Sequence, residues 1–226
     1  MQEVRSNLPV FLATAERVLA QLEMVQFVIA SFNEAQAEMA RSLARDYPDL
    51  PVSIVVGKTA EAIQASSCCL ACSGSVSLEL LYHEKPSVIH YRIGWLADQL
   101  QRRFRNAKYI TLVNLLATEE ITRSPHDPPY DPNEDAPNSV PFPEYLTCTD
   151  QSQQMARWLV RWVKGGPSRS RVCTELARLK EQHARPGASQ RAATFIRATV
   201  QEARHSSSLH TAPHLSRTRA SHHVLD

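Results

Sequence analysis

Short apolar segments alternate with helix-favouring segments over the first half of the chain, and this alternation restricts the possible folds more than any other feature. The segments expected to form strands are residues 25–30, 52–56, 68–72 and 87–91. The segments expected to form helices are residues 8–22, 33–45, 59–65, 75–82 and 94–105. The strand segments are short and apolar, as strands covered on both faces are. We therefore predict an α/β fold, with a Rossmann-like parallel sheet and helices on both of its faces.

The second half of the chain has a different character. Residues 124–143 hold seven of the 14 prolines, so no regular element is expected there. From His205 onward the sequence has no apolar periodicity, and we expect a disordered tail. The remaining segments, expected to be helical, are residues 155–164, 169–184 and 188–203. We divide the chain into an α/β domain at 1–123, an insertion loop at 124–143, C-terminal helices completing the domain at 144–203 and a tail at 204–226.

The overall composition is that of a soluble globular protein. Hydrophobic residues make up 43% of the 226 residues and charged residues 21%, which excludes wholesale disorder. The 25 Lys and Arg nearly balance the 23 Asp and Glu, so no nucleic-acid partner is expected. No apolar run approaches the length that spans a bilayer, and the N-terminus does not resemble a secretory signal.

The cysteines and histidines show no regular ligand pattern. The five cysteines are an odd number, and Cys68 and Cys69 are adjacent, which fits a reducing cytoplasm better than a disulfide framework. Cys69 and Cys72 form a C-x-x-C that leaves a redox or zinc pair open, but a second such pair is absent. The histidines after residue 204 lack the spacing of a metal site. We expect a cytoplasmic protein that uses no metal and no cofactor.

The turn between an apolar strand and a helix at Ser73-Gly74-Ser75 is the most informative local motif. Gly74 permits a tight turn and close approach of a ligand, and the two serines can cap the helix. The N-terminus of a helix favours an anion. Glu79 follows one helical turn later and could accept hydrogen bonds from paired ribose hydroxyls. These residues indicate a nucleotide diphosphate site, although such turns are common in α/β proteins and Glu79 could be a solvated helix residue.

A second turn follows the strand at 52–56 and contains Gly57, Lys58 and Ala60. It lacks the spacing of a P-loop. Its main chain could bind the edge of a base, and a plain strand-to-helix connection is the alternative.

Five segments carry residues that occur together in one family of enzymes. They are Gly57 to Ile63, Ser73 to Glu79 with Lys85-Pro86, His90 to Arg92, Tyr109 to Ala117 and Pro186 to Ala192. Together they resemble the lipid-A-disaccharide synthases, glycosyltransferases of the two-domain GT-B type. The Asn-Leu-Leu-Ala block that begins at Asn114 is what selects this family. The resemblance extends from residue 1 to about residue 203, outside the proline-rich insertion, and implies the C-terminal half of a GT-B fold.

The resemblance also implies a reaction and its partners. A diacylglucosamine would be transferred from a UDP-diacylglucosamine donor to the 6-hydroxyl of diacylglucosamine 1-phosphate, with inversion at the anomeric carbon. Such lipid substrates imply a peripheral position on the inner face of the cytoplasmic membrane. The segment from Trp95 through Arg102, Arg103, Arg105 and Lys108 mixes aromatic and basic residues as an interfacial helix does. A homo-oligomer is compatible with the resemblance.

Residue roles follow from the resemblance position by position. Ser73, Gly74 and Ser75 would hold the UDP phosphates, and Glu79 the ribose. The turn at Gly57, Lys58 and Ala60 would meet the uracil. Arg92 and Asn114 belong to donor-side segments, and Arg92 could neutralise the leaving group. The plainer alternatives are that Arg92 ends a strand and that Asn114 caps a helix.

Several departures from the family pattern affect the expected activity. The Gly-Ser-Arg turn that precedes Glu3-Val4 in the family is missing here, as is the N-terminal domain expected to bind the acceptor and supply a general base. Val113 stands where the family usually has proline. We therefore expect a donor-binding half that is inactive alone. A stand-alone or degenerate UDP-sugar-binding module and another UDP-sugar chemistry, such as epimerisation, are the alternatives.

Overall fold

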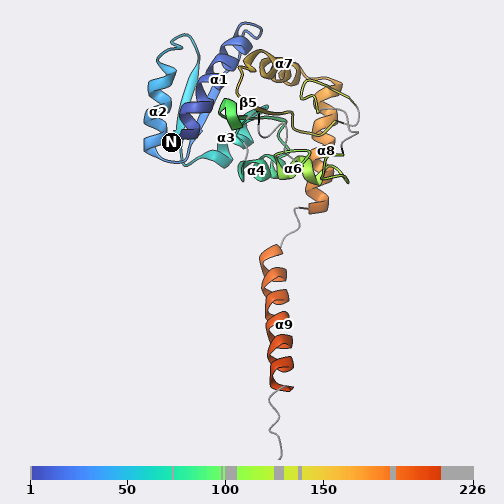
Figure 1. Cartoon of the computed structure of the whole chain (residues 1–226). Coiled ribbons are helices and arrows are strands. Elements are labelled where there is room, and N and C mark those ends of the chain that lie inside the picture. Colours follow the sequence, from blue (N-terminus) through green and yellow to red (C-terminus); the bar gives the residue numbers. More distant parts are fainter. Residues whose placement is uncertain are drawn as a thin grey trace, which may run out of the picture. The chain divides into compact units, whose positions relative to one another are not determined.

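The computed structural model describes residues 2–72, 74–97, 99, 106–124, 130–136, 139–183 and 187–209, and for residues 188 and 202–209 the main chain alone. The chain divides into two compact units, Met1–Ala184 and Arg185–Asp226, which we describe separately (Figure 1). The elements of the first unit are α1 (Gln2–Leu19), β1 (Phe27–Ser31), α2 (Glu34–Ala44), β2 (Val52–Val56), α3 (Thr59–Ala65), β3 (Cys69–Ala71), α4 (Val76–Tyr82), β4 (Ser87–Arg92), α6 (Leu112–Leu116), β5 (Glu144–Thr147), α7 (Ser152–Val163) and α8 (Pro167–His183). The second unit contains α9 (Ala188–Leu209).

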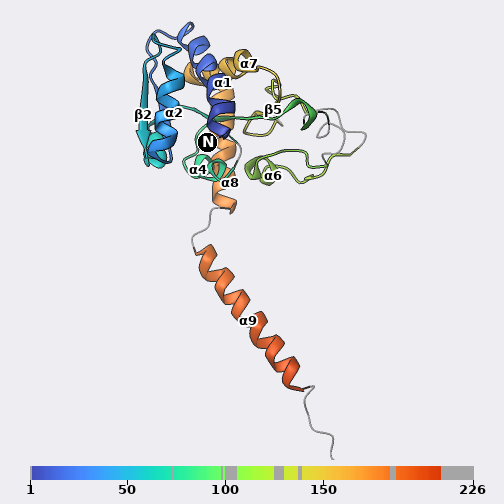
Figure 2. The same ribbon diagram turned by 60° about the vertical axis from the view of Figure 1, so that its left-hand side comes forward.

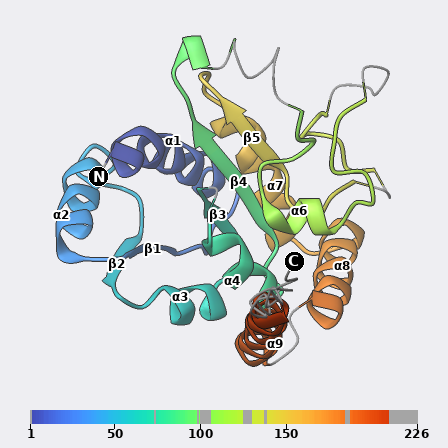
Figure 3. The same cartoon turned by 60° about the horizontal axis from the view of Figure 1, so that its bottom comes forward.

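Every strand pair in the described part of the chain is parallel. The strands form two sheets, one with the order β1-β2 and one with the order β3-β4-β5 (Figure 3). The connections β1-α2-β2 and β3-α4-β4 each place a helix between two parallel neighbours. The predicted α/β class, with parallel strands flanked by helices, is therefore confirmed. The division into two sheets was not predicted.

The β1-β2 sheet is covered by the first two helices. Leu8 and Leu12 of α1 and Ala40 of α2 are buried, and Ile29 of β1 and Ile54 of β2 pack against them. α2 runs beside β2 (Figure 2). This small apolar cluster is separate from the main core of the unit.

The main core lies around β4 and α7. Four residues at helical spacing on α7 face it, and they are Met155, Trp158, Leu159 and Trp162. Trp158 and Trp162 are only 4% and 0% exposed, so both rings pack in the core. The Arg161 guanidinium lies 4.9 Å from the centre of the Trp158 ring. That contact leaves the charged end of Arg161 at the surface of the unit.

Residues 144–147 were expected in a helical region, and this prediction is wrong. They form β5, which pairs with β4 from Ile89↔Glu144 to Arg92↔Thr147. The strand has four residues and follows directly after Pro143, so no local periodicity marked it. Its position beside β4 is fixed by main-chain hydrogen bonds such as that from Ile89 N to Pro143 O, at 2.9 Å.

The described parts of the proline-rich segment, 130–136 and 139–143, contain no helix or strand. Side-chain contacts nevertheless attach them to α7 and α8. Trp158 Nε1 donates to Pro132 O at 3.0 Å, and Arg161 forms an ion pair with Asp135 at 2.9 Å. Arg171 of α8 also forms an ion pair with Asp135. Phe142 is fully buried in the main core. The end of this segment is thus an integral part of the folded unit.

The start of α1 and the end of α9 differ from the predicted helix boundaries by six residues each. α1 begins at Gln2, six residues before the predicted start, and contains Pro9 in its interior. The prediction began at Leu8 because the helical spacing of apolar residues begins there. α9 extends to Leu209, into the segment expected to be disordered, and its described side chains are exposed. Residues 210–226 of the predicted tail lie outside the described residues.

Replacement of Phe142 by alanine tests whether the proline-rich segment contributes to the core. The Phe142→Ala variant should lose ~3–5 kcal/mol of unfolding free energy, because a fully buried ring is removed. Phe32→Ala is the matched control, since Phe32 is 80% exposed, and it should change stability by less than about 0.5 kcal/mol. Urea denaturation followed by tryptophan fluorescence measures both. Equal losses in the two variants would contradict the core position of Phe142.

Candidate functional site

The carboxyl ends of β3 and β4 bring two of the predicted site segments to one sheet edge. Ala71 pairs with Ile89, so Gly74 and Arg92 each lie three residues beyond a paired position. Both residues are exposed, as are Ser75 and Glu79. Ser73 lies outside the described residues. The edge therefore presents a glycine turn and a guanidinium from neighbouring strands.

The second predicted turn belongs to the other sheet. Gly57, Lys58 and Ala60 are all exposed at the end of β2. Gly57 N donates to Ser31 O at 2.9 Å, which anchors the turn to the end of β1. Lys58 directly precedes α3, and its side chain makes no capping hydrogen bond.

Both turn glycines have main-chain conformations that other residues rarely adopt. The φ angles are +65° at Gly57 and +147° at Gly74. A Cβ added at either position would meet nothing within 4 Å, so conformation rather than crowding explains the glycine. The space beside each turn is open to a ligand.

The expected cap of α4 by Ser75 is not observed. Ser75 has φ −58° and ψ −27° and makes no side-chain capping bond. Instead Ser77 Oγ donates to Gly74 O at 2.8 Å. The Ser75 hydroxyl is consequently not engaged in capping the helix. Glu79 follows on α4 one turn later, and its side chain has no partner among the described residues.

The end of β4 is held by Asn7, a residue of α1 that the sequence analysis did not single out. Asn7 Oδ1 accepts a hydrogen bond from Arg92 N at 2.9 Å and lies 3.0 Å from His90 Nδ1. Asn7 Nδ2 donates to Glu3 O at 3.0 Å. Because Asn7 Oδ1 is an acceptor, we assign the imidazole proton of His90 to Nδ1. Asn7 and His90 are 2% and 0% exposed, so this link is buried.

His90 is neutral in the folded protein. Burial, together with the nearby Arg92 guanidinium, lowers the pKa of His90 from 6.5 to about 4. Its Nε2 has no hydrogen-bond partner among the described residues. The ring of Phe11 contacts the imidazole edge-on, with centroids 5.9 Å apart. A charged imidazole in this position would be strongly disfavoured.

Asp150 lies just beyond β5 and adds a carboxylate near the same edge. Ser152 N donates to Asp150 Oδ1 at 2.8 Å, and Arg17 Nε donates to Ser152 Oγ at 2.9 Å. Although partial burial acts to raise it, the pKa of Asp150 is lowered by hydrogen bonds from Ser152 and by the charges of Arg17 and Arg92. Arg92 is thus placed in the field of an ionised carboxylate.

Asn114 occupies a different environment from the other predicted site residues. It is fully buried, and Nδ2 donates to Phe142 O at 2.7 Å and to Glu144 Oε1 at 2.8 Å. Asn114 Oδ1 accepts from Phe142 N at 3.1 Å. Thr111, not Asn114, is the N-cap of α6, so the capping alternative is wrong. Glu144 pairs with Ile89, three residues before Arg92, which places this cluster about 10 Å from the end of β4.

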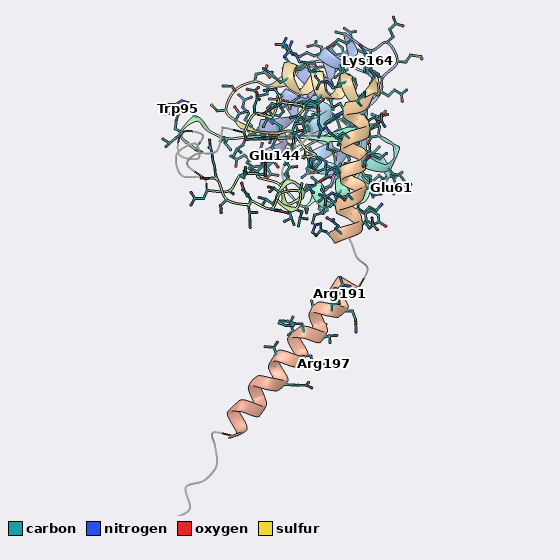
Figure 4. The ribbon with its side chains drawn as sticks, turned by 90° about the vertical axis from the view of Figure 1, so that its right-hand side faces the viewer. Glu61, Trp95, Glu144, Lys164, Arg191 and Arg197 are labelled. Atoms are coloured by element: carbon teal, nitrogen blue, oxygen red, sulfur yellow. The ribbon has the colours of Figure 1, made fainter. Side chains whose placement is uncertain are left out.

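Glu144 is the centre of this buried cluster and was also missed by the sequence analysis. Its carboxylate accepts hydrogen bonds from Ile110 N at 2.6 Å, from Thr111 N at 2.8 Å and from the Thr111 hydroxyl. The side chain lies in the interior of the first unit, whereas Trp95 lies at its periphery (Figure 4). The cluster fixes the segment from Ile110 to Asn114 against the start of β5. No local sequence pattern marked Glu144, because neither its burial nor strand β5 was predicted.

Comparisons with known proteins identify the family. The family model described as lipid-A-disaccharide synthetase matches residues 1–154. This chain belongs to that family. A lipid-A-disaccharide synthase of Idiomarina loihiensis is 35% identical over 120 residues, which are 53% of this chain and 32% of that protein. The lipid-A-disaccharide synthases of Paraburkholderia xenovorans and Pseudomonas aeruginosa are 36% and 33% identical over 109 and 107 residues.

The match to the lipid-A-disaccharide synthetase family covers part of each relative. The chain spans 28–32% of the length of these three relatives. Among the described helices, none is long and apolar enough to cross a membrane. The described residues contain no group of three or more His, Cys, Asp or Glu side chains that could hold a metal ion.

Replacement of Glu144 by glutamine tests the buried cluster. The Glu144→Gln variant should lose ~1–3 kcal/mol of stability, because the new amide group would face N–H donors of the segment at Ile110 and Thr111. Glu120→Gln is the matched control, since Glu120 is exposed and forms one surface ion pair with Lys108 at 3.2 Å. This control should change stability by less than about 1 kcal/mol. Thermal denaturation of both variants at neutral pH measures the difference.

The acid dependence of stability tests the buried state of His90. A histidine with a pKa of 6.5 in the unfolded chain and about 4 in the folded chain binds its proton more tightly when unfolded. Stability should therefore fall as the pH drops from about 6.5 to about 4, by about 3 kcal/mol in total. His90→Asn keeps an N–H toward Asn7 but cannot become charged, so this slope should largely disappear. Urea denaturation at several pH values compares the two proteins, with His183→Asn, a change of an exposed residue on α8, as control. A slope unchanged in His90→Asn would contradict the assignment.

Proposed function

We propose that this chain binds the nucleotide diphosphate of a UDP-diacylglucosamine donor as the donor-side half of a lipid-A-disaccharide synthase. The complete reaction would transfer the diacylglucosamine to the 6-hydroxyl of diacylglucosamine 1-phosphate. The observation that supports this most is the sheet edge that carries the Gly74 turn and Arg92, with Glu79 exposed on the helix that follows the turn, in a chain of this family. The proposal uses no metal and no cofactor.

The proposed roles follow the exposed groups of this edge. Ser73, Gly74 and Ser75 hold the two phosphates, where the first turn of α4 offers main-chain N–H groups. Glu79 accepts hydrogen bonds from the ribose hydroxyls. The open conformation of Gly74 and the hydroxyl of Ser75, which does not cap the helix, support this assignment.

Other residues complete the proposed donor site. Gly57, Lys58 and Ala60 contact the uracil at the end of β2. The Arg92 guanidinium compensates the charge that develops on UDP as the glycosidic bond breaks. The amide of Asn114 is already bonded to Phe142 and Glu144. Asn114 therefore acts on the donor side indirectly, because it fixes the segment from Ile110 to Asn114 in place.

A second candidate function is binding of a UDP-sugar without turnover. The exposed groups of the proposed site, the Gly74 turn, Glu79 and Arg92, are all assigned to the donor. We assign no general base for the acceptor hydroxyl within the described residues. The two functions share the donor site and differ in whether a disaccharide forms.

We also propose that the protein acts at the inner face of the cytoplasmic membrane as a peripheral protein. Trp95 and Leu96 are 67% and 68% exposed just after β4, whereas Lys108, farther along the chain, is half-buried and forms an ion pair with Glu120 at 3.2 Å. An exposed aromatic and aliphatic pair suits the interface of a lipid bilayer. Arg102, Arg103 and Arg105 of the predicted interfacial helix lie outside the described residues, whereas residues 95–97 are helical.

Binding of UDP provides the decisive test of the donor site. UDP at about 100 times its Kd should raise the melting temperature by ~5–10 °C, because a ligand that binds the folded state adds about 2.7 kcal/mol of stability. Glu79→Ala should abolish this rise, whereas Glu181→Ala, a change of an exposed residue on α8, should retain it. Absence of any rise in the unaltered chain would refute the site.

An assay for disaccharide formation from both lipid substrates then separates the two candidate functions. Binding of UDP without product supports the non-catalytic module, and formation of product supports the transferase.

A further inference from the structure

Phe32 is a large apolar side chain that is exposed directly beside the turn at Gly57. It follows the last residue of β1 and is 80% exposed. The pairing of β1 with β2 extends to Ser31↔Val56, so Phe32 and Gly57 are the next residues of the two strands. Neighbouring strands lie about 4.8 Å apart, and Gly57 N donates to Ser31 O at 2.9 Å. The phenyl ring therefore belongs to a residue next to the turn that we assign to the uracil.

The main chain that carries this ring is held on both sides. Phe32 N donates to Gln36 Oε1 at 3.0 Å, and Gln36 N donates to Asn33 Oδ1 at 3.0 Å. Asn33 is the N-cap of α2, so these bonds belong to the start of that helix. On the other side Ser31 is buried and bonded to Gly57. A ligand that orders the ring has only two side-chain torsions to fix, because the main chain is already in place.

The fold itself does not use the Phe32 ring. The apolar cluster that covers the β1-β2 sheet includes Ile29 of the same strand, whereas Phe32 belongs neither to that cluster nor to the main core of the described unit. An exposed ring gains none of the free energy that burial provides. A ligand that covers this ring would gain an apolar contact that the folded chain leaves open.

The turn at Gly57 leaves room for such a ligand. A Cβ added at Gly57 would meet nothing within 4 Å, and Lys58 and Ala60 are exposed. A flat ring that meets the main chain of this turn with its edge would present a face to a side chain from the neighbouring strand. Phe32 lies at the end of that neighbouring strand.

An exposed phenyl ring is suited to the face of a nucleobase. Every base has a π face, and stacking on an aromatic side chain contributes to binding without any hydrogen bond. None of the residues that we assign to the donor is aromatic. Phe32 thus supplies a chemical group that this set lacks.

We propose that Phe32 is the stacking platform for the base of the nucleotide. Its phenyl ring lies against one face of the uracil, while the turn at Gly57 contacts the edge of the uracil. This role rests on the proposed donor site and adds a residue to it. Phe32 contributes affinity through the base alone, and the phosphate contacts at the Gly74 turn do not depend on it.

Replacement of Phe32 by alanine tests the stacking contact. Phe32→Ala should raise the Kd for UDP ~10-fold or more, because stacking of the base is lost. The Kd for inorganic pyrophosphate, which has no base, should stay within about 2-fold. Phe195→Ala is the matched control, since Phe195 is 73% exposed on α9, and it should bind UDP as the unaltered chain does. Isothermal titration calorimetry measures each Kd.

Replacement of Phe32 by tryptophan separates stacking from a change in the shape of the turn. The Phe32→Trp variant keeps an aromatic face, so its Kd for UDP should stay within about 3-fold of that of the unaltered chain. Its tryptophan fluorescence should fall on addition of UDP by more than that of the unaltered chain. Pyrophosphate should cause no such difference between the two proteins.

The outcomes distinguish the role of Phe32 from the donor site itself. Binding of UDP by Phe32→Ala as tightly as by the unaltered chain would overturn the role of Phe32 and leave the donor site standing. An equal loss of UDP and pyrophosphate binding would also overturn it, because the change would then act on the phosphate turn. If the unaltered chain binds no UDP, the donor site fails and the role of Phe32 fails with it.

Discussion

The pairing of β4 with β3 on one side and β5 on the other is the constraint on which the rest of the first unit depends. One row across this sheet joins Ala71, Ile89 and Glu144. The carboxyl ends of these parallel strands lie at the same edge of the sheet. The register of the row therefore sets how far the loops after β3, β4 and β5 extend beyond that edge. It places Gly74 and Arg92 at one level, and it leaves Glu144 in the interior. Val88, Ile89 and His90 are completely buried, so a slip of one residue would expose apolar side chains and is disfavoured.

Two buried polar side chains, Asn7 and Glu144, attach the surrounding segments to this sheet. Burial of a polar group is costly unless its hydrogen bonds are satisfied, and both residues meet that condition through main-chain partners. Asn7 fixes the main chain at Arg92 while the Arg92 side chain remains exposed. The main chain of Arg92 is held in place and its charged guanidinium is exposed, so this residue is suited to bind a phosphate from solvent. Stabilisation of a leaving diphosphate requires such preorganised charge.

The proposed donor residues belong to two sheets. Gly57 follows β2 in one sheet, and Gly74 and Arg92 belong to the other.

The sequence by itself determined the α/β class and most of the elements, with β5 and α6 as exceptions. Local patterns predicted these elements, because a strand or a helix is favoured by the spacing of apolar residues along a short segment. Examples are the apolar runs at 52–56 and 87–91 and the helical spacing of Met155, Trp158 and Trp162. The glycine turn at Gly74 was also predictable, because φ at this position is a property of a few neighbouring residues. Only the tertiary structure decided that Asn114 is bonded to Glu144, that Asn7 holds Arg92, and that β5 pairs with β4. These contacts join residues 30 and 85 positions apart, and the strand register that creates them leaves no periodic pattern in the chain.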